Sequence, residues 1–396
     1  MHGPVAVIFN RFGPYHLARL GAAAKRVPIV GIEVVAKDRT YAWDVVRGSE
    51  GFRRVTLFET EEANLAGSRL EVTIGRILER ECPAALAVCG WSLPEALAGL
   101  AWAASNSVPS LVMSESQRQD HRRNRLAESV KRRVVSLSSA ALVGGSTHVD
   151  YAAELGLPRE RIFTGYDVVD NEHFRSGAAQ AGEDAPLRAR LGLPARFFLT
   201  CCRFVYQKNL LRLLEAYGRY RVSSLDPWSL LLLGDGPLRA DVERAIRGLG
   251  LEKWVLTPGF MQYDVLPAYY GLASSFILPS MREPWGLVVN EAMAAGLPVL
   301  VSERCGCARD LVEEGRNGFT FDPYDVEELS KLMLRLSSMP EEQREAMGKA
   351  SQEISSRWTP QVFAENLEKA VEAALAAPRP RLSAVDRGLL WLLIRR

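Results

Sequence analysis

The stretch that decides the fold runs from residue 275 to 302 and reads SFILPSMREPWGLVVNEAMAAGLPVLVS. Its apolar ends predict two strands, Ser275–Leu278 and Pro298–Ser302. Between them the sequence predicts a helix over Gly286–Ala295, with a proline just before it and Gly296 favouring a left-handed end. A strand, a helix and a second strand in this order form a βαβ unit, which indicates a parallel sheet.

The start of this predicted helix is a candidate anion site. Free backbone N–H groups and the positive end of the helix dipole lie there, at the carboxyl edge of the preceding strand. The amides belong to Gly286, Leu287 and Val288. Glu283 stands in the loop before the helix, and Glu291 follows about a turn and a half into it. Two carboxylates that flank an anion site suit a ligand with hydroxyl groups on both sides of a phosphate.

The same alternation of apolar runs and amphipathic stretches extends along the whole chain. It predicts an α/β fold of two doubly wound domains, with ligands bound in a cleft at the carboxyl ends of the strands. In the first half the predicted strands are Val5–Phe9, Ile29–Val35, Ala85–Val88, Ser110–Met113 and Ala140–Val143. The further strands predicted in the second half are Phe198–Cys202, Ser229–Leu233 and Trp254–Thr257. Predicted helices include Leu17–Lys25, Leu70–Glu81 and Pro94–Ala104.

A run of small and polar residues, SGAAQAGEDAP, indicates where the two domains join. We predict a linker over residues 176–186, because such residues are typical of linkers. The domains are then residues 1–175 and 187–358. Residues 359–396 are expected to form helices that pack back on the first domain.

Composition excludes several classes of protein. The 396 residues carry 49 basic and 47 acidic side chains, a formal charge of +2, and 47% are hydrophobic. These values are typical of packed soluble domains and exclude disordered or collagen-like chains. A near-zero charge also argues against a dedicated nucleic-acid binder. We find no signal peptide or spanning segment, and the six cysteines lack zinc-ligand spacing, so we expect a cytoplasmic protein with reduced thiols.

The pattern E-x7-E from Glu283 to Glu291, followed by AMAAGLPV, resembles the donor-site signature of retaining glycosyltransferases of family 4, or glycosyl transferases group 1. This family has the GT-B fold, in which two Rossmann-like domains face each other across a cleft. Further likeness lies in CCRFVYQKN with Arg203 and Lys208, in the turn GDGP from Gly234 to Pro237, and in Gly259-Phe260. Asn317-Gly318 and DNEHF at residues 170–174 also match. The resemblance is strong over residues 140 to 325.

This resemblance implies a catalytic set of Arg203, Lys208 and Glu283. The two cations would hold the donor diphosphate, and Glu283 would hold hydroxyls of the transferred sugar. Glu291 would hold the ribose hydroxyls. The remaining donor-binding residues would be Gly286, Leu287, Val288, Gly234, Asp235, Gly259 and Phe260. The resemblance also implies front-face attack, with a nucleotide-diphosphate sugar as donor, no protein nucleophile, no metal ion and no other cofactor.

The N-terminal half is expected to carry the acceptor. Related enzymes have a glycine-rich loop after the first strand, and here that loop includes Gly13 and His16. Ser116 stands where the family has a histidine. Either His16 or His121 is a candidate replacement, and both are also candidates for plain packing or surface residues.

One segment carries a strong local charge although the whole chain is nearly neutral. Residues 118–133 hold seven basic and two acidic side chains, a local charge of +5. Such a segment is expected to contact an anionic membrane, attract a phosphorylated acceptor, or form a solvated helix face. The apolar run GLLWLLIRR at residues 388–396 is too short to span a bilayer. Peripheral contact with the inner membrane face is therefore an expectation beside the cytoplasmic location.

The leading hypothesis is a hexosyltransferase that transfers a sugar from a nucleotide sugar to a hydroxyl of a glycan, a lipid-linked acceptor or a small molecule. Two alternatives are a nucleotide-sugar isomerase of the same fold and a non-catalytic relative that binds nucleotide sugar or glycan. The donor base, the sugar, the acceptor and the linkage stay open.

Overall fold

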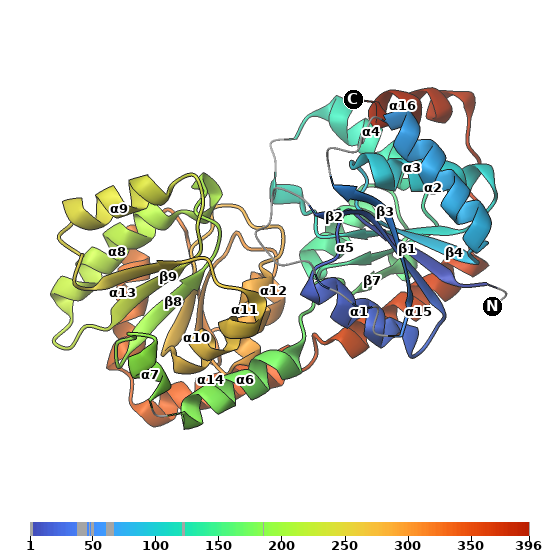
Figure 1. Ribbon diagram of the computed structural model, residues 1–396. Helices are drawn as coiled ribbons and strands as arrows, with labels where there is room; N and C mark the ends of the chain where they lie inside the picture. The colour runs from blue at the N-terminus through green and yellow to red at the C-terminus, as the bar shows by residue number, and fades with distance from the viewer. Residues whose placement is uncertain are drawn as a thin grey trace. The chain divides into compact units, whose positions relative to one another are not determined.

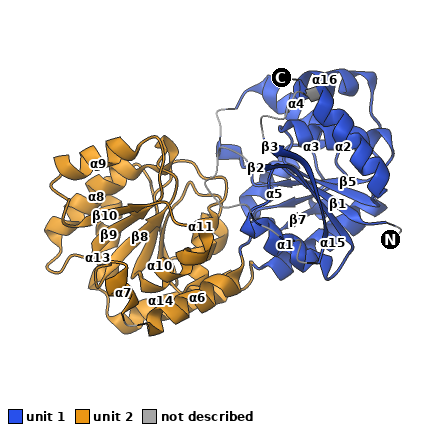
Figure 2. Ribbon diagram, viewed as in Figure 1, with its two compact units in different colours: residues 1–169, 359–396 blue, residues 170–358 orange. Residues whose placement is uncertain are grey.

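The computed structural model describes residues 3–37, 46, 48, 51–60, 67–120, 123–184 and 186–395. They form two compact units (Figure 2). Unit 1 comprises residues 1–169 and 359–396, and unit 2 comprises residues 170–358. Each unit is built around its own parallel sheet.

Unit 1 has a seven-stranded sheet in the order β3-β2-β1-β4-β5-β6-β7. Helices α1 and α15 lie together on one side of it, and α2, α3 and α16 lie on the other (Figure 1). The strands are β1 Val5–Phe9, β2 Ile29–Lys37, β3 Arg53–Thr60, β4 Ala85–Cys89, β5 Ser110–Ser114, β6 Ala140–Val143 and β7 Ile162–Thr164. The helices are α1 Pro14–Ala24, α2 Gly67–Glu81, α3 Pro94–Ser105, α4 Arg125–Val135, α5 Ser146–Glu154, α15 Pro360–Ala376 and α16 Ala384–Ile394.

Unit 2 has a six-stranded sheet in the order β10-β9-β8-β11-β12-β13. Its strands are β8 Phe197–Cys201, β9 Ser229–Leu233, β10 Val255–Gly259, β11 Ser275–Leu278, β12 Val299–Ser302 and β13 Gly318–Phe321. Its helices are α6 Asn171–Glu183, α7 Leu187–Arg190, α8 Leu210–Ser223, α9 Arg239–Gly248, α10 Leu266–Leu272, α11 Leu287–Ala294, α12 Ala308–Leu311, α13 Val326–Ser338 and α14 Glu341–Ser355.

Both sheets are doubly wound, and the strand order reverses between β1 and β4 in unit 1 and between β8 and β11 in unit 2. Ligands of such sheets bind outside the carboxyl ends of the strands at these reversal points. The predicted α/β architecture with two Rossmann-like domains is therefore confirmed. In unit 2, the motif-bearing loops follow β8 and β11, the two strands at the reversal point.

Every predicted strand is present, with ends that shift by at most two residues. Three strands escaped prediction. Strand β3 is an edge strand whose residues are half-buried or exposed, so it lacks the continuous apolar run of the buried strands. Strand β7 has three residues, and β13 begins with a glycine.

The predicted linker at residues 176–186 is mostly helix. Residues up to Glu183 belong to α6, whose N-terminus is capped by Asp170, with the Oδ1 atom accepting from the His173 amide at 3.2 Å. Small residues serve packing here, because a Cβ added at Gly177 would lie 2.6 Å from the Cβ of Pro267 in α10. The boundary between the units accordingly falls at residues 169 and 170, before α6.

Candidate functional site

The predicted helix after β11 is present as α11. Gly286 caps it in the left-handed region with φ of 110°, and Gly296 follows its end with φ of 87°. A Cβ at Gly286 would lie 3.0 Å from Leu278 and 3.3 Å from Glu283, so glycine suits both the backbone and the space. The amides of Leu287 and Val288, at the first two positions, have no acceptor within the helix. The helix start that the sequence predicts as a candidate anion site therefore lies at the carboxyl end of β11.

Lys208 and Glu283 form an ion pair at this edge, with the Lys208 Nζ donating to Oε2 of Glu283. The Ser280 hydroxyl donates to the same oxygen at 3.0 Å. Both members of the pair are largely buried, since their side chains are 18% and 13% exposed. The structure thus pairs Lys208, which is predicted to bind phosphate, with Glu283, which is predicted to bind the sugar.

The loops that carry this pair are tied together by hydrogen bonds. Lys208 ends a short turn after β8, and Asn209 follows it in the left-handed region with φ of 58°. The Asn209 side chain donates to the Pro279 carbonyl at 3.1 Å and to the Pro323 carbonyl at 2.7 Å. The Met281 amide donates to the Gln207 carbonyl at 2.8 Å. These bonds hold the loops that carry the Lys208 ammonium and the Glu283 carboxylate next to each other.

Burial and the ion pair together set the protonation of Lys208 and of its neighbour Cys202. Burial alone would lower the pKa of Lys208, but the charge of Glu283 and the hydrogen bond to it raise that pKa above its ordinary value. Burial raises the pKa of the neighbouring Cys202 thiol to about 12, although Lys208 acts to lower it. The lysine therefore stays charged at neutral pH, and the thiol stays protonated.

A second loop holds Glu283 from the other side. The Gly306 amide donates to the Glu283 carbonyl at 3.0 Å, and the Cys307 amide donates to the Trp285 carbonyl at 3.2 Å. Cys305 and Cys307 are buried. The cysteines at this place act as small packing residues under the loop before α11.

The turn at Gly234, Asp235 and Gly236 packs against the loop that carries Arg203. A Cβ at Gly234 would lie 1.8 Å from the Cys202 carbonyl oxygen, and one at Gly236 would lie 2.7 Å from the Phe204 carbonyl oxygen. The Phe204 amide donates to the Asp235 carbonyl at 2.8 Å. The two glycines thus shape the loop after β8, which gives them a structural role whether or not they touch a ligand.

The remaining donor-side candidates surround this loop. The Arg203 side chain is exposed, and no described residue pairs with its guanidinium. Asp235 lies 3.6 Å from Arg239 in an exposed ion pair. Gly259 has φ of 103°, and its carbonyl accepts from the Gly234 amide at 2.9 Å. Phe260, next to it, is 36% exposed.

Glu291 lies deeper than its neighbours. It is fully buried in α11, and the Tyr270 hydroxyl donates to its Oε2 atom at 2.7 Å. Burial raises the pKa of the adjacent Cys201 thiol, and the charge of Glu291 raises it further. Tyr270 comes from α10, and no local sequence pattern pairs it with this carboxylate.

The acceptor-side candidates of unit 1 have a clear local role. The Gly13 amide donates to Nδ1 of His16 at 3.0 Å, which caps the start of α1. Burial, aided by the charge of Arg19, lowers the pKa of His16 to about 3, so the imidazole is neutral. The Ser116 amide donates to the Ser114 hydroxyl at 3.1 Å. His121 lies outside the described residues.

A cluster of buried polar residues near the carboxyl ends of the strands of unit 1 was not predicted. The Cys89 thiol and the Tyr166 hydroxyl are 3.1 Å apart, and Asp167 lies 3.8 Å from Arg19. Oδ2 of Asp167 and Oε1 of Glu95 are buried without a hydrogen-bond partner among the described residues. Burial, followed by the charge of Glu115, raises the pKa of Asp167 well above its ordinary value. These residues come from α1, β4, α3 and the segments after β5 and β7, so no local motif joins them.

The basic segment at residues 118–133 is largely paired within unit 1. Arg125 and Arg132 alone among its described basic residues have no ion-pair partner in the described structure, and Arg122 lies outside it. The pairs are Arg118 with Glu154 at 2.5 Å, Arg123 with Glu128 at 3.1 Å, Lys131 with Glu128 at 2.9 Å, and Arg133 with Asp386. The local charge of +5 is therefore reduced by acidic residues from other elements.

Two searches of the described residues gave negative results. They contain no group of three or more His, Cys, Asp or Glu side chains arranged to hold a metal ion. None of their helices is at once long enough and apolar enough to cross a membrane.

Comparisons with known proteins point to unit 2. Residues 187–354 match the family of glycosyl transferases group 1. The chain is 38% identical to the sulfoquinovosyl transferase SQD2 of Arabidopsis thaliana over 33% of this chain and 25% of that protein. It is 30% identical to the alpha-D-kanosaminyltransferase of Streptomyces kanamyceticus over 47% of each chain. The matched part thus spans a quarter to about half the length of these curated relatives.

Solved structures resemble the whole chain. A sucrose-phosphate synthase from Thermosynechococcus elongatus has a TM-score of 0.73 at 18% identity, covering 93% of this chain and 98% of its own. Anabaena HepE, solved in complex with UDP and glucose, has a TM-score of 0.72 at 17% identity, covering 94% of this chain and 100% of its own. These neighbours show that the fold is GT-B.

Proposed function

We propose that this protein is a retaining glycosyltransferase of family 4 that transfers a hexosyl group from a nucleoside-diphosphate sugar to an acceptor hydroxyl. The observation that carries the proposal is the Lys208–Glu283 ion pair beside the start of α11. An ammonium and a carboxylate held side by side match a sugar phosphate, in which a phosphate oxygen and a sugar hydroxyl are neighbours. The family match over residues 187–354 and the names of the relatives support the same reaction class.

In this reaction the bond between the anomeric carbon and the phosphate oxygen breaks, and a nucleoside diphosphate leaves with added negative charge. Lys208, Arg203 and the amides of Leu287 and Val288 would stabilise that charge. Fixed donors of this kind each contribute roughly 100- to 1,000-fold to the rate in other enzymes. The acceptor hydroxyl bonds to the anomeric carbon on the face that the leaving group vacates, and its proton passes to a donor phosphate oxygen. The products are the glycosylated acceptor and the nucleoside diphosphate.

The carboxylates would position the donor. Glu283 would accept hydrogen bonds from hydroxyls of the transferred sugar, and Glu291 from the ribose hydroxyls. Phe260 and the backbone near Gly259 would contact the base, while Gly234 and Asp235 keep Arg203 in place. This scheme requires no protein nucleophile and no metal ion, so a chelator is expected to leave the rate unchanged.

We assign the acceptor to unit 1. Support comes from the buried polar cluster of Glu95, Asp167 and their neighbours at the strand-order reversal, where ligands of such sheets bind. Unpaired buried oxygens gain stability from a hydrogen-bond donor, and acceptor hydroxyls are such donors. His16 is neutral and accepts a hydrogen bond from the Gly13 amide. Within the described residues it stays the candidate for the histidine of the acceptor side.

The decisive test is a donor screen over UDP-, GDP- and other nucleotide sugars, with detection of released nucleoside diphosphate in the presence of glycan, lipid and small-molecule acceptors. Acceptor-dependent release by the wild-type chain, lost in Lys208→Ala, is the expected result. Conversion of the donor to an isomer without any acceptor would instead identify an isomerase. Donor binding without turnover for every acceptor would identify a binding protein.

A further inference from the structure

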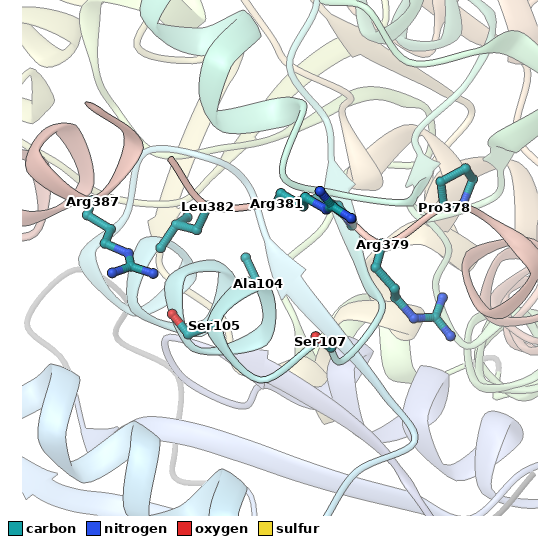
Figure 3. Close-up of a pocket in the computed structure, with 9 residues that line it drawn as sticks. Ala104, Ser105, Ser107, Pro378, Arg379, Arg381, Leu382 and Arg387 are labelled. Atoms are coloured by element: carbon teal, nitrogen blue, oxygen red, sulfur yellow. The ribbon is translucent and has the colours of Figure 1, made fainter. Parts of the chain in front are cut away.

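A cationic cavity in unit 1 lies far in sequence from every donor-side residue. It has a volume of about 560 Å³ and lies where the end of α3 meets the segment that joins α15 to α16. Figure 3 shows Arg387 and Ser105 toward one end, Arg379 and Ser107 toward the other, and Arg381 between them. No acidic side chain is among its lining residues. Three arginine and two serine side chains line it, a set of donors that suits a phosphate-bearing anion.

The arginines of this cavity are unequal. Arg379 is engaged in the protein, since its Nη1 donates to the carbonyls of Ala374 at 3.0 Å and Leu375 at 3.1 Å at the end of α15. For Arg381 and Arg387, no partner to the guanidinium exists in the part of the chain that the structure describes. These two cations are therefore available to an external anion without loss of an existing ion pair.

Exposed apolar side chains lie beside these cations on α16. Trp391 is 54% exposed and Leu392 is 62% exposed. Arg387 and Trp391 are four residues apart in the helix, so they lie on the same side of it. Arg395 follows after four more residues, with its guanidinium 4.8 Å from the Trp391 ring centre. Arg395 also pairs with Glu71 of α2 at 3.2 Å, so it is not available to an external anion. Trp391 and Leu392 form a short exposed apolar row next to Arg387, an arrangement typical of helices that lie at a membrane surface.

The helix that carries this row is held firmly on unit 1. Leu390 and Ile394, on the neighbouring face of the helix, are buried in the core of the unit. Arg133 of α4 pairs with Asp386, and the Ser383 hydroxyl accepts from the Asp386 amide at 3.2 Å to cap the helix. The apolar row is therefore presented outward as part of a fixed surface.

We propose that this surface docks unit 1 on a bilayer of anionic phospholipid, with a headgroup phosphate in the cavity at Arg381 and Arg387 and with Trp391 and Leu392 at the boundary between headgroups and acyl chains. A free phosphate would use the cavity alone. The apolar row next to it adds an area that a lipid surface covers and a free phosphate does not. The surface differs from the basic segment at residues 118–133, whose charges are largely paired, and it does not depend on the donor chemistry of unit 2.

The test measures co-sedimentation of the full chain with vesicles. One set contains phosphatidylcholine alone, and the other an equimolar mixture of phosphatidylcholine and phosphatidylglycerol. We expect binding to the anionic set alone, weakened by added salt because screening shortens the reach of the charges. The double variant Arg381→Gln, Arg387→Gln is expected to lose about fivefold in partition coefficient for each arginine. Trp391→Gln tests the apolar part separately and is expected to weaken binding as well.

The matched control is Arg247→Gln with Leu225→Gln, which removes an exposed arginine and a fully exposed leucine from unit 2. This control is expected to bind like the wild type. Circular dichroism verifies that each variant is folded. Absence of binding to anionic vesicles, equal binding to both vesicle sets, or equal loss in the control would each overturn the proposal. A thermal shift with inorganic phosphate, lost in the arginine variant but without vesicle binding, would show a site for a free anion instead.

Discussion

The Tyr270 hydroxyl lies 2.7 Å from Oε2 of Glu291 and donates a hydrogen bond to it inside unit 2. The tyrosine is buried between Phe174 and Phe276, whose ring centres are both 5.8 Å from its own. Packing thus fixes the hydroxyl, and the hydroxyl helps to fix the carboxylate that we assign to the ribose. Tyr270 is a positioning residue in this scheme.

Replacement of Tyr270 by Phe is expected to raise KM for the donor and to leave kcat within a few-fold of wild type. The buried carboxylate loses one hydrogen bond, which costs about 1–3 kcal/mol, and its orientation toward the ribose becomes less defined. Initial rates over a range of donor concentrations measure both constants. Tyr217→Phe is the control, because it removes a buried hydroxyl that donates to the Trp228 carbonyl at 2.9 Å, away from the site. An unchanged KM in Tyr270→Phe would remove the positioning role.

Replacement of Lys208 by Ala is expected to lower kcat at least tenfold in a folded protein, which corresponds to about 1.4 kcal/mol of lost transition-state stabilisation. Arg203→Ala is expected to act in the same direction. The exposed lysine of the same unit, Lys253, provides the control Lys253→Ala. Wild-type turnover by either site variant would show that the leaving group is stabilised elsewhere.

Replacement of Gly234 by Ala is expected to destabilise unit 2 by about 1–3 kcal/mol, since the residue has φ of 129° and its Cβ would clash with the Cys202 carbonyl oxygen. Gly218→Ala makes the same chemical change within α8, where a Cβ meets no atom within 4 Å, and is expected to stabilise by about 0.5–1 kcal/mol. Urea unfolding followed by tryptophan fluorescence compares the two. Equal stability of the two variants would contradict the packing argument for the turn.

Acid is expected to destabilise unit 1 through His16. Its pKa is about 3 in the folded protein and near 6.5 in the unfolded chain, so below about pH 6.5 the unfolded chain binds a proton that the folded one does not. The contribution of neutral His16 to the free energy of unfolding is complete above pH 6.5. It falls as the pH drops toward 3, by up to about 1.4 kcal/mol per pH unit. His16→Asn keeps an acceptor for the Gly13 amide and removes the titration. Melting temperatures of the two proteins should therefore converge as pH falls, whereas a pH-independent gap would refute this assignment.

Sequence patterns predicted the elements whose signal is local. Strands such as β1, β6 and β9 are apolar on both faces and were located to the residue, and the donor-side residues follow such strands in recognisable loops. Helix α6 was missed because its small residues were interpreted as a sign of flexibility. The structure shows that they permit close packing, since α10 approaches α6 so closely that a Cβ at Gly271 of α10 would lie 2.4 Å from the Ala178 carbonyl oxygen.

Partners far apart in the chain could not be predicted in this way. Tyr270 and Glu291 meet because α10 and α11 pack together, and the sequence between them contains no motif for that contact. Asp167, Glu95 and Cys89 likewise converge only when three separate elements of unit 1 reach one sheet edge. Their types are ordinary in isolation, and burial alone makes them chemically distinct.

The ion pair between Lys208 and Glu283 also has a consequence for selectivity. A lysine that is already neutralised offers little net attraction to a simple anion such as inorganic phosphate, and the carboxylate beside it repels one. A ligand gains from this site only when it brings hydroxyl donors for Glu283 together with a phosphate for Lys208. The pair would therefore favour the binding of sugar phosphate esters over the binding of free inorganic phosphate.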